Sequence, residues 1–272
     1  MIIYFSIFII LFICFVFYIK FRNYIPILMY HRIANIPSDR NALPLEKFKE
    51  QLAYLSKKGF HTITTTQLAD YYLNKKPLPS KPILLTFDDG YADNFSLALP
   101  LLKEKNMTAV VFPISNWIGK PNKWENFNKQ ETSTMTLDEL NSWSQSGMEI
   151  APHTKDHPFL TQCDSLHLTT EVTECKHFFE KLLQKPMNFI CYPYGCFNEN
   201  VLKAVKTAGY IGGFAIFDKV PLWKINLFAL PRIPIPSRQP LWEFKLKVSS
   251  IHILFIAMRK WERNLKRILK NK

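Results

Sequence analysis

The sequence has no cysteine pair at a recognised zinc-binding spacing, and none of its five cysteines forms a C-x-x-C motif. The sequence therefore shows no zinc-binding cysteine motif, and no disulfide framework is evident. Cys191 and Cys196 are close enough in sequence to bridge across a turn in an oxidising compartment, but free thiols are the expected state. The chain also lacks internal repeats and low-complexity linkers, so 272 residues with 47% hydrophobic content predict a substantial folded core.

Charged side chains are absent from residues 1–19, which end against Lys20 and Arg22. At about 1.5 Å per residue, a helix of this length just spans a hydrocarbon core of about 30 Å. We therefore predict a membrane anchor over residues 1–22. A cleaved signal peptide is the alternative, but it requires a basic start and a small-residue cleavage site, and neither is visible.

Acidic residues are few: 22 Asp and Glu stand against 35 Lys and Arg, a net charge of +13. Such a balance suits a nucleic-acid-binding protein or one lying on an anionic membrane. The basic excess is concentrated at the two ends, so we expect membrane lipids and no nucleic acid as partners. Residues 241–272 are predicted to form a basic amphipathic helix on the lipid surface; the alternative is a terminal helix packed on the domain.

Residues 23–240 are predicted to be one catalytic domain of α/β class. Apolar runs alternate with segments of helical period such as 45–60 and 166–184; the runs lie at 25–33, 82–87, 107–114, 148–154, 187–191, 210–217 and 228–235. This alternation predicts a parallel sheet, open or closed as a barrel, with a site at the carboxyl ends of its strands.

Two polar clusters follow predicted strands. Asp88 and Asp89 end the apolar run at 82–87, although an Asp-Gly pair is also an ordinary turn former. His153 and His157 follow the next-but-one strand, and this spacing lets both imidazoles face one metal ion. Two histidines and one carboxylate are a common ligand set that leaves positions for water and substrate.

The adjacent carboxylates can divide two roles. If Asp89 binds the metal ion, Asp88 remains available as the general base that takes a proton from the attacking water. His31, at the end of the first strand, is a candidate general acid because histidine ordinarily titrates near neutral pH. A core histidine bonded to backbone is its alternative role.

The ordered motifs "TFDDG" (86–90), "HTKDHP" (153–158) and "YPYG" (192–195) resemble those of the polysaccharide deacetylases with a NodB homology domain, carbohydrate esterase family 4. The resemblance covers roughly residues 25–236. It implies a distorted (β/α) barrel that removes acetyl groups from N-acetylated sugars with one divalent metal ion. It also implies these roles: Asp88 as general base, Asp89, His153 and His157 as metal ligands, and the backbone N–H of Tyr194 as an oxyanion donor.

Two positions depart from that pattern. Many members carry an arginine just before the Pro-Tyr of the third motif, where this chain has "CYPYG" (191–195). They supply the acid histidine from a late "L-x-H" segment, where this chain has "LPRIP" (230–234). However, "MYHRI" (29–33) and "LPRI" resemble the branch that deacetylates poly-N-acetylglucosamine, which implies His31 as the general acid. Arg232 is then a candidate for the charge that orients Asp88; a structural strand-end arginine is the alternative.

We therefore expect a metal-dependent carbohydrate N-deacetylase, a single-pass protein of the bacterial cytoplasmic membrane. Zn²⁺ suits the ligand set most readily, and Co, Ni, Mn or Fe are alternatives. The substrate is either an exported N-acetylated glycan or a lipid-linked sugar. The charges after residue 19 favour a cytoplasmic domain and the family an exported one, so both sides stay open. A non-catalytic glycan-binding protein of the same fold is the rival hypothesis.

Overall fold

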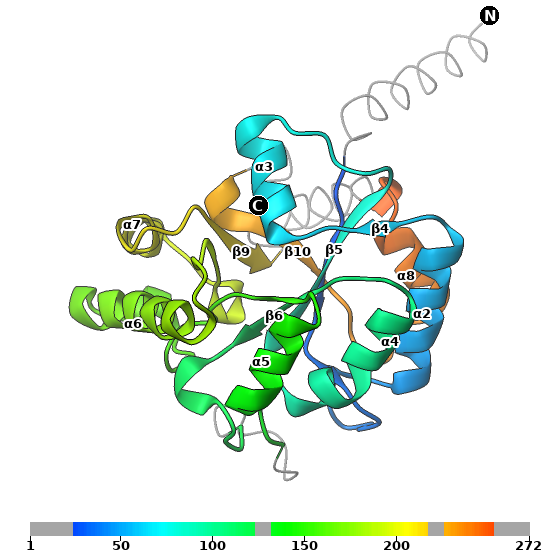
Figure 1. The fold of residues 1–272 in the computed structure, drawn as a ribbon, viewed down its shortest axis with the longest axis horizontal. Coiled ribbons are helices and arrows are strands. Elements are labelled where there is room, and N and C mark those ends of the chain that lie inside the picture. The colour runs from blue at the N-terminus through cyan, green and yellow to red at the C-terminus, as the bar shows by residue number, and fades with distance from the viewer. Residues whose placement is uncertain (1–23, 123–131, 217–225, 253–272) are drawn as a thin grey trace, which may run out of the picture.

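A computed structural model describes residues 24–122, 132–216 and 226–252 (Figure 1). The predicted anchor over residues 1–22 lies outside these ranges, as does the predicted tail beyond residue 252. Over the ranges that are described, no helix combines the length and the apolar character needed to cross a membrane. Two residues of the predicted tail, Phe244 and Val248, are buried in the core of the domain.

Seven strands form a curled sheet in the order β7-β6-β5-β1-β10-β9-β8, and every neighbouring pair is parallel. Their bounds are Ile27–Tyr30 (β1), Pro82–Asp89 (β5), Val110–Pro113 (β6), Glu149–Ile150 (β7), Phe189–Cys191 (β8), Gly212–Ile216 (β9) and Leu230–Pro234 (β10). An eighth strand, β4 (His61–Thr62), pairs with the start of β5. The short strands β2 (Arg32–Ile33) and β3 (Ala42–Leu43) pair with each other apart from this sheet.

The sheet is a half-barrel, whereas the sequence predicts a distorted barrel. Its first and last strands, β7 and β8, are not paired as strands in the described structure. A backbone hydrogen bond links the segments that follow them, from the Cys191 N–H to the carbonyl oxygen of Pro152, at 2.9 Å. A longer ladder is prevented because β7 has only two residues and Pro152, just beyond it, has no N–H to donate.

Helices surround the sheet (Figure 1): six of those described pack against its outer face, and α3 packs against the apolar cluster inside the curl. They are α2 (Leu45–Lys57), α3 (Thr65–Asn74), α4 (Leu99–Glu104, continuing a π-helical turn at Asn94–Ala98), α5 (Leu137–Gln145), α6 (Ser165–Leu183), α7 (Glu199–Thr207) and α8 (Leu241–Lys247). Capping boxes define two helix starts, Thr64 with Gln67 and Thr136 with Glu139. Each box satisfies backbone N–H groups that have no partner within the helix.

The two faces of the sheet pack in two separate apolar clusters. Along β5, Ile83, Leu85 and Phe87 pack with the surrounding helices, whereas Leu84 packs inside the curl with residues of β1, β6 and β9. Both faces are buried, which explains why this strand reads as a continuous apolar run in the sequence. Alternation along the strand then directs Thr86 and Asp88 into the interior of the half-barrel.

Candidate active site

Asp88 lies at the carboxyl end of β5 and is paired with Arg232 of β10. The guanidinium donates two hydrogen bonds to the carboxylate, one from Nη1 to Oδ1 and one from Nη2 to Oδ2, the latter at 2.9 Å. Arg232 is fully buried, and its Nη1 also donates to Thr86 Oγ1 at 3.2 Å. Burial alone raises the pKa of Asp88, but the charge and hydrogen bonds of Arg232 are the main opposing effects and hold that pKa well below its usual range. Asp88 is thus a buried carboxylate that stays ionised.

Asp89 is directed toward the histidines by an unusual backbone conformation. Strand alternation alone would point its side chain away from Asp88. Its φ of 68° breaks the alternation, and Asp89 Oδ1 lies 3.6 Å from His153 Nε2 and 3.4 Å from His157 Nε2. Gly90 follows at a φ of 69°, where an added Cβ would lie 2.8 Å from the Cβ of Pro113. The "DDG" sequence therefore provides both the carboxylates and the tight turn that aims the second one.

His153 and His157 are both buried, and burial lowers their pKa values, to about 4 for His153. Both rings are therefore neutral at pH 7, which is the state that binds metal ions. His153 Nδ1 lies 2.8 Å from the carbonyl oxygen of Cys191. Because a carbonyl oxygen only accepts, Nδ1 carries the proton, and the lone pair of Nε2 faces the space that it shares with the ligand atoms of Asp89 and His157.

These three residues fit a divalent metal ion. Their ligand atoms all lie within 4.8 Å of one another. Tetrahedral nitrogen and oxygen ligands at the usual Zn–N and Zn–O lengths are about 3.3–3.5 Å apart. The distances from Asp89 Oδ1 to the two histidine nitrogens, 3.4 and 3.6 Å, are close to this separation. A second triplet shares His153, namely Asp88, His153 and Cys191. It fits less well because both oxygens of Asp88 already accept hydrogen bonds from Arg232.

His31 lies directly after β1, the strand between β5 and β10. Its Nε2 is 3.9 Å from Asp88 Oδ2, and its side chain is 19% exposed. Asn94 holds the backbone here by donating from Nδ2 to the His31 carbonyl oxygen at 2.8 Å. The ring is thus close to the catalytic carboxylate candidate and accessible from outside.

Tyr194 lies in the short turn Pro193–Gly195 after β8, with a φ of 57°. Its ring contacts the ring of His157, with centroids 4.7 Å apart. His157 itself has a φ of 64°. Three predicted site residues therefore have left-handed backbone: Asp89, His157 and Tyr194. Such a conformation costs about 1–3 kcal/mol per residue, and strain of this kind concentrates at functional sites.

Glu171, which was not among the site residues predicted from the sequence, holds the loop that contains His153 and His157. Glu171, on α6, is fully buried, and its Oε2 accepts hydrogen bonds from the backbone N–H groups of Lys155 and Asp156 at 3.0 and 2.9 Å. The signal in the sequence was that Glu171 lies next to Val172, on the apolar face of the helix predicted over residues 166–184.

The four described cysteines are free thiols, as predicted. Burial raises the pKa of the Cys191 thiol well above its usual value.

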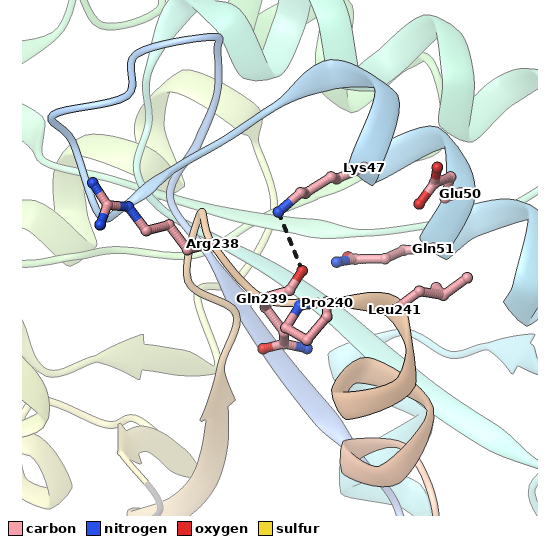
Figure 2. Close-up of a pocket in the computed structure, with 7 residues that line it drawn as sticks. All are labelled: Lys47, Glu50, Gln51, Arg238, Gln239, Pro240 and Leu241. Carbon is pink, nitrogen blue, oxygen red and sulfur yellow. Dashed lines mark hydrogen bonds between the residues drawn. The ribbon is translucent and has the colours of Figure 1, made fainter.

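A separate pocket of about 290 Å³ lies between α2 and the segment after β10 (Figure 2). Lys47 crosses it and donates to the backbone carbonyl oxygens of Ser237 and Gln239, at 3.1 and 3.4 Å. None of the predicted site residues lines this pocket. We assign it a structural role, since these bonds fasten the loop before α8 to α2.

The site thus contains an ionised carboxylate, three candidate metal ligands and an accessible histidine. It is formed at the carboxyl ends of β1, β5 and β8 and by the loop that follows β7. These are the parts that hydrolysis requires: a base, a position for a Lewis acid and a proton donor for the leaving group.

Comparisons with known proteins agree on one family. The family profile described as Polysaccharide deacetylase matches residues 75–212. YxkH of Bacillus subtilis, whose name places it among polysaccharide deacetylases, is 30% identical over 211 residues, 78% of this chain and 71% of YxkH. The poly-β-1,6-N-acetyl-D-glucosamine N-deacetylase of Staphylococcus epidermidis is 26% identical over 202 residues, 71% of this chain and 67% of that protein.

Solved structures share the fold. The Streptococcus pyogenes deacetylase PplD in complex with acetate gives a TM-score of 0.70 at 24% identity, covering 83% of this chain and 98% of PplD. IcaB from Ammonifex degensii gives a TM-score of 0.69 at 21% identity, covering 83% of this chain and 97% of IcaB. At these identities the matches establish the curled parallel sheet and its helices.

Proposed function

Because this chain belongs to the polysaccharide deacetylases, the NodB-type family of carbohydrate deacetylases, we propose that it hydrolyses N-acetyl groups of amino sugars in a glycan and requires a divalent metal ion. The observation that carries the proposal is the grouping of Asp88, Asp89, His153 and His157 at one edge of the sheet. A relative named poly-β-1,6-N-acetyl-D-glucosamine N-deacetylase supports a β-linked N-acetylglucosamine polymer as substrate.

In the proposed mechanism, Asp89, His153 and His157 hold the metal ion, with Zn²⁺ as the ion that suits them most readily. An ion held there would supply a Lewis acid for the acetyl carbonyl and for the attacking water. Asp88 takes the proton of the attacking water, and its bonds to Arg232 fix the orientation of its oxygens. The Tyr194 backbone N–H stabilises the negative charge on the acetyl oxygen, and His31 protonates the departing amine. The products are acetate and a glucosamine unit.

We also propose that the chain is a single-pass membrane protein anchored by residues 1–22. The substrate is then an exported polymer or a sugar linked to membrane lipid, depending on which side the domain faces. A reporter fused after residue 22 that is active in one compartment alone decides between the two.

Removing the metal should abolish deacetylation. Protein treated with a chelator and then desalted is expected to release no acetate from a β-1,6-linked N-acetylglucosamine pentamer, and one equivalent of Zn²⁺ should restore release. A membrane lipid extract is tested in parallel for the lipid-linked alternative. Acetate release by metal-free protein would contradict metal dependence. If metal-loaded protein releases none from either substrate, a glycan-binding role replaces the enzyme.

Replacing His31 with glutamine should slow amide hydrolysis much more than ester hydrolysis. An amine must be protonated to leave, whereas 4-nitrophenolate leaves without help, so the loss of an acid affects only the amide. We expect kcat for the pentamer to fall about a hundredfold to a thousandfold and 4-nitrophenyl acetate hydrolysis to change little. Equal losses on both substrates would mean that His31 acts as something other than the acid.

A further inference from the structure

Two partly exposed aromatic rings stack on each other beside the candidate active site. The centroids of Phe159 and Tyr194 are 3.9 Å apart and their planes differ by 12°. The ring of Tyr194 also contacts the ring of His157, with centroids 4.7 Å apart. Exposure increases along this row, from 7% for His157 to 39% for Tyr194 and 44% for Phe159. The row therefore leads from a proposed metal ligand to the surface.

Phe159 and Tyr194 are among the exposed large hydrophobic side chains. Neither ring belongs to the two apolar clusters that hold the sheet and helices together. Exposed aromatic surface beside a catalytic cluster commonly marks a ligand contact, because covering it with a ligand removes apolar area from water. Phe159 directly follows the "HTKDHP" segment, so the loop that places the histidines also places this ring.

We infer that Phe159, supported by Tyr194, is a platform for a sugar ring next to the one being deacetylated. This inference rests on the proposed function. The ring of a β-linked N-acetylglucosamine carries its polar substituents equatorially, which leaves axial C–H groups on its faces. Such an apolar face packs on an aromatic ring, whose electron-rich surface attracts C–H hydrogens. Because Tyr194 lies between Phe159 and His157, a sugar on the outer face of Phe159 is not the sugar at the metal ligands.

The test compares chain lengths in Phe159→Ala. With the β-1,6-linked pentamer of N-acetylglucosamine, we expect KM to rise roughly fivefold to tenfold while kcat stays within about twofold. With the monosaccharide, neither constant should change. Phe159→Trp should restore the pentamer KM. Phe178→Ala is the matched control, since Phe178 on α6 is 38% exposed and contacts Phe179 rather than the site.

Binding measurements separate this inference from the proposed function. If wild-type protein releases no acetate from any chain, the proposed function fails, and calorimetric titration with the pentamer still tests the platform. Weaker pentamer binding by Phe159→Ala than by wild type and Phe178→Ala supports it. Equal pentamer affinity in wild type and Phe159→Ala overturns it. A loss that is the same for monosaccharide and pentamer also overturns it, because Phe159 would then act on the reacting sugar.

Discussion

Replacing Asp88 with asparagine should lower kcat for deacetylation by about a thousandfold or more and leave the metal ion bound. Asparagine keeps the shape of the side chain but cannot accept a proton from water. The proposed ligands Asp89, His153 and His157 are unchanged in this variant. Acetate release and metal content per chain, measured on the same preparation, check both halves of the prediction. The amide pairs less well with Arg232, so the comparison is made where circular dichroism shows the variant to be folded.

His153→Ala is the matched contrast, because it removes a proposed ligand and leaves the base. We expect it to lose both bound metal and turnover. The two variants also distinguish the two donor sets that share His153. If Asp88→Asn lost the metal as completely as His153→Ala, the ion would be held by Asp88, His153 and Cys191, and the division of roles between the two aspartates would be wrong.

The sequence predicts the strands and helices well because the apolar runs and helical periods are local patterns. The run at 82–87 becomes β5, and the segment 166–184 becomes α6, at Ser165–Leu183. Strand order is not local: nothing in the sequence states that β1 lies between β5 and β10. That order brings His31, Asp88 and Arg232 together, although Asp88 and Arg232 are 144 residues apart in the chain.

The orientation of the site side chains, and the contacts that hold them in place, depend on tertiary structure. The left-handed backbone at Asp89 and His157 is set by the turns around them, and aspartate and histidine give only a weak signal for it. Glu171 reads as one polar residue in an amphipathic helix, and its role follows only from the loop folded over it. The failure of the sheet to close likewise depends on where Pro152 comes to lie.

Replacing Arg232 with methionine should reduce the free energy of unfolding at pH 7 by about 3–5 kcal/mol, because it leaves the Asp88 carboxylate buried without its opposite charge. It should also raise the pKa of Asp88, since the charge of Arg232 would no longer offset the desolvation of the carboxylate. The acid limb of the kcat/KM profile should then move to higher pH. Chemical denaturation and the pH dependence of acetate release measure the two effects.

The pH dependence of stability provides an independent check on the same pair. In the wild type, the pKa of Asp88 is lower in the folded state than in the unfolded state, so its contribution is fully present above the unfolded value of about 3.9 and is lost as pH falls through the folded value. In Arg232→Met the order of the two pKa values reverses, and Asp88 destabilises the fold increasingly as pH rises through the raised value. The difference in stability between the two proteins should therefore be largest near neutral pH and shrink in acid.

Two further variants separate charge pairing from loss of the long side chain. Adding Asp88→Asn to Arg232→Met removes the buried charge and should recover part of the lost stability, a coupling that independent sites would not show. Arg238→Met makes the same substitution at an exposed arginine beside the pocket in Figure 2 and should leave stability nearly unchanged. If Arg232→Met kept both the wild-type stability and the wild-type acid limb, Arg232 would be only a structural strand-end residue, and the low pKa of Asp88 would need another source.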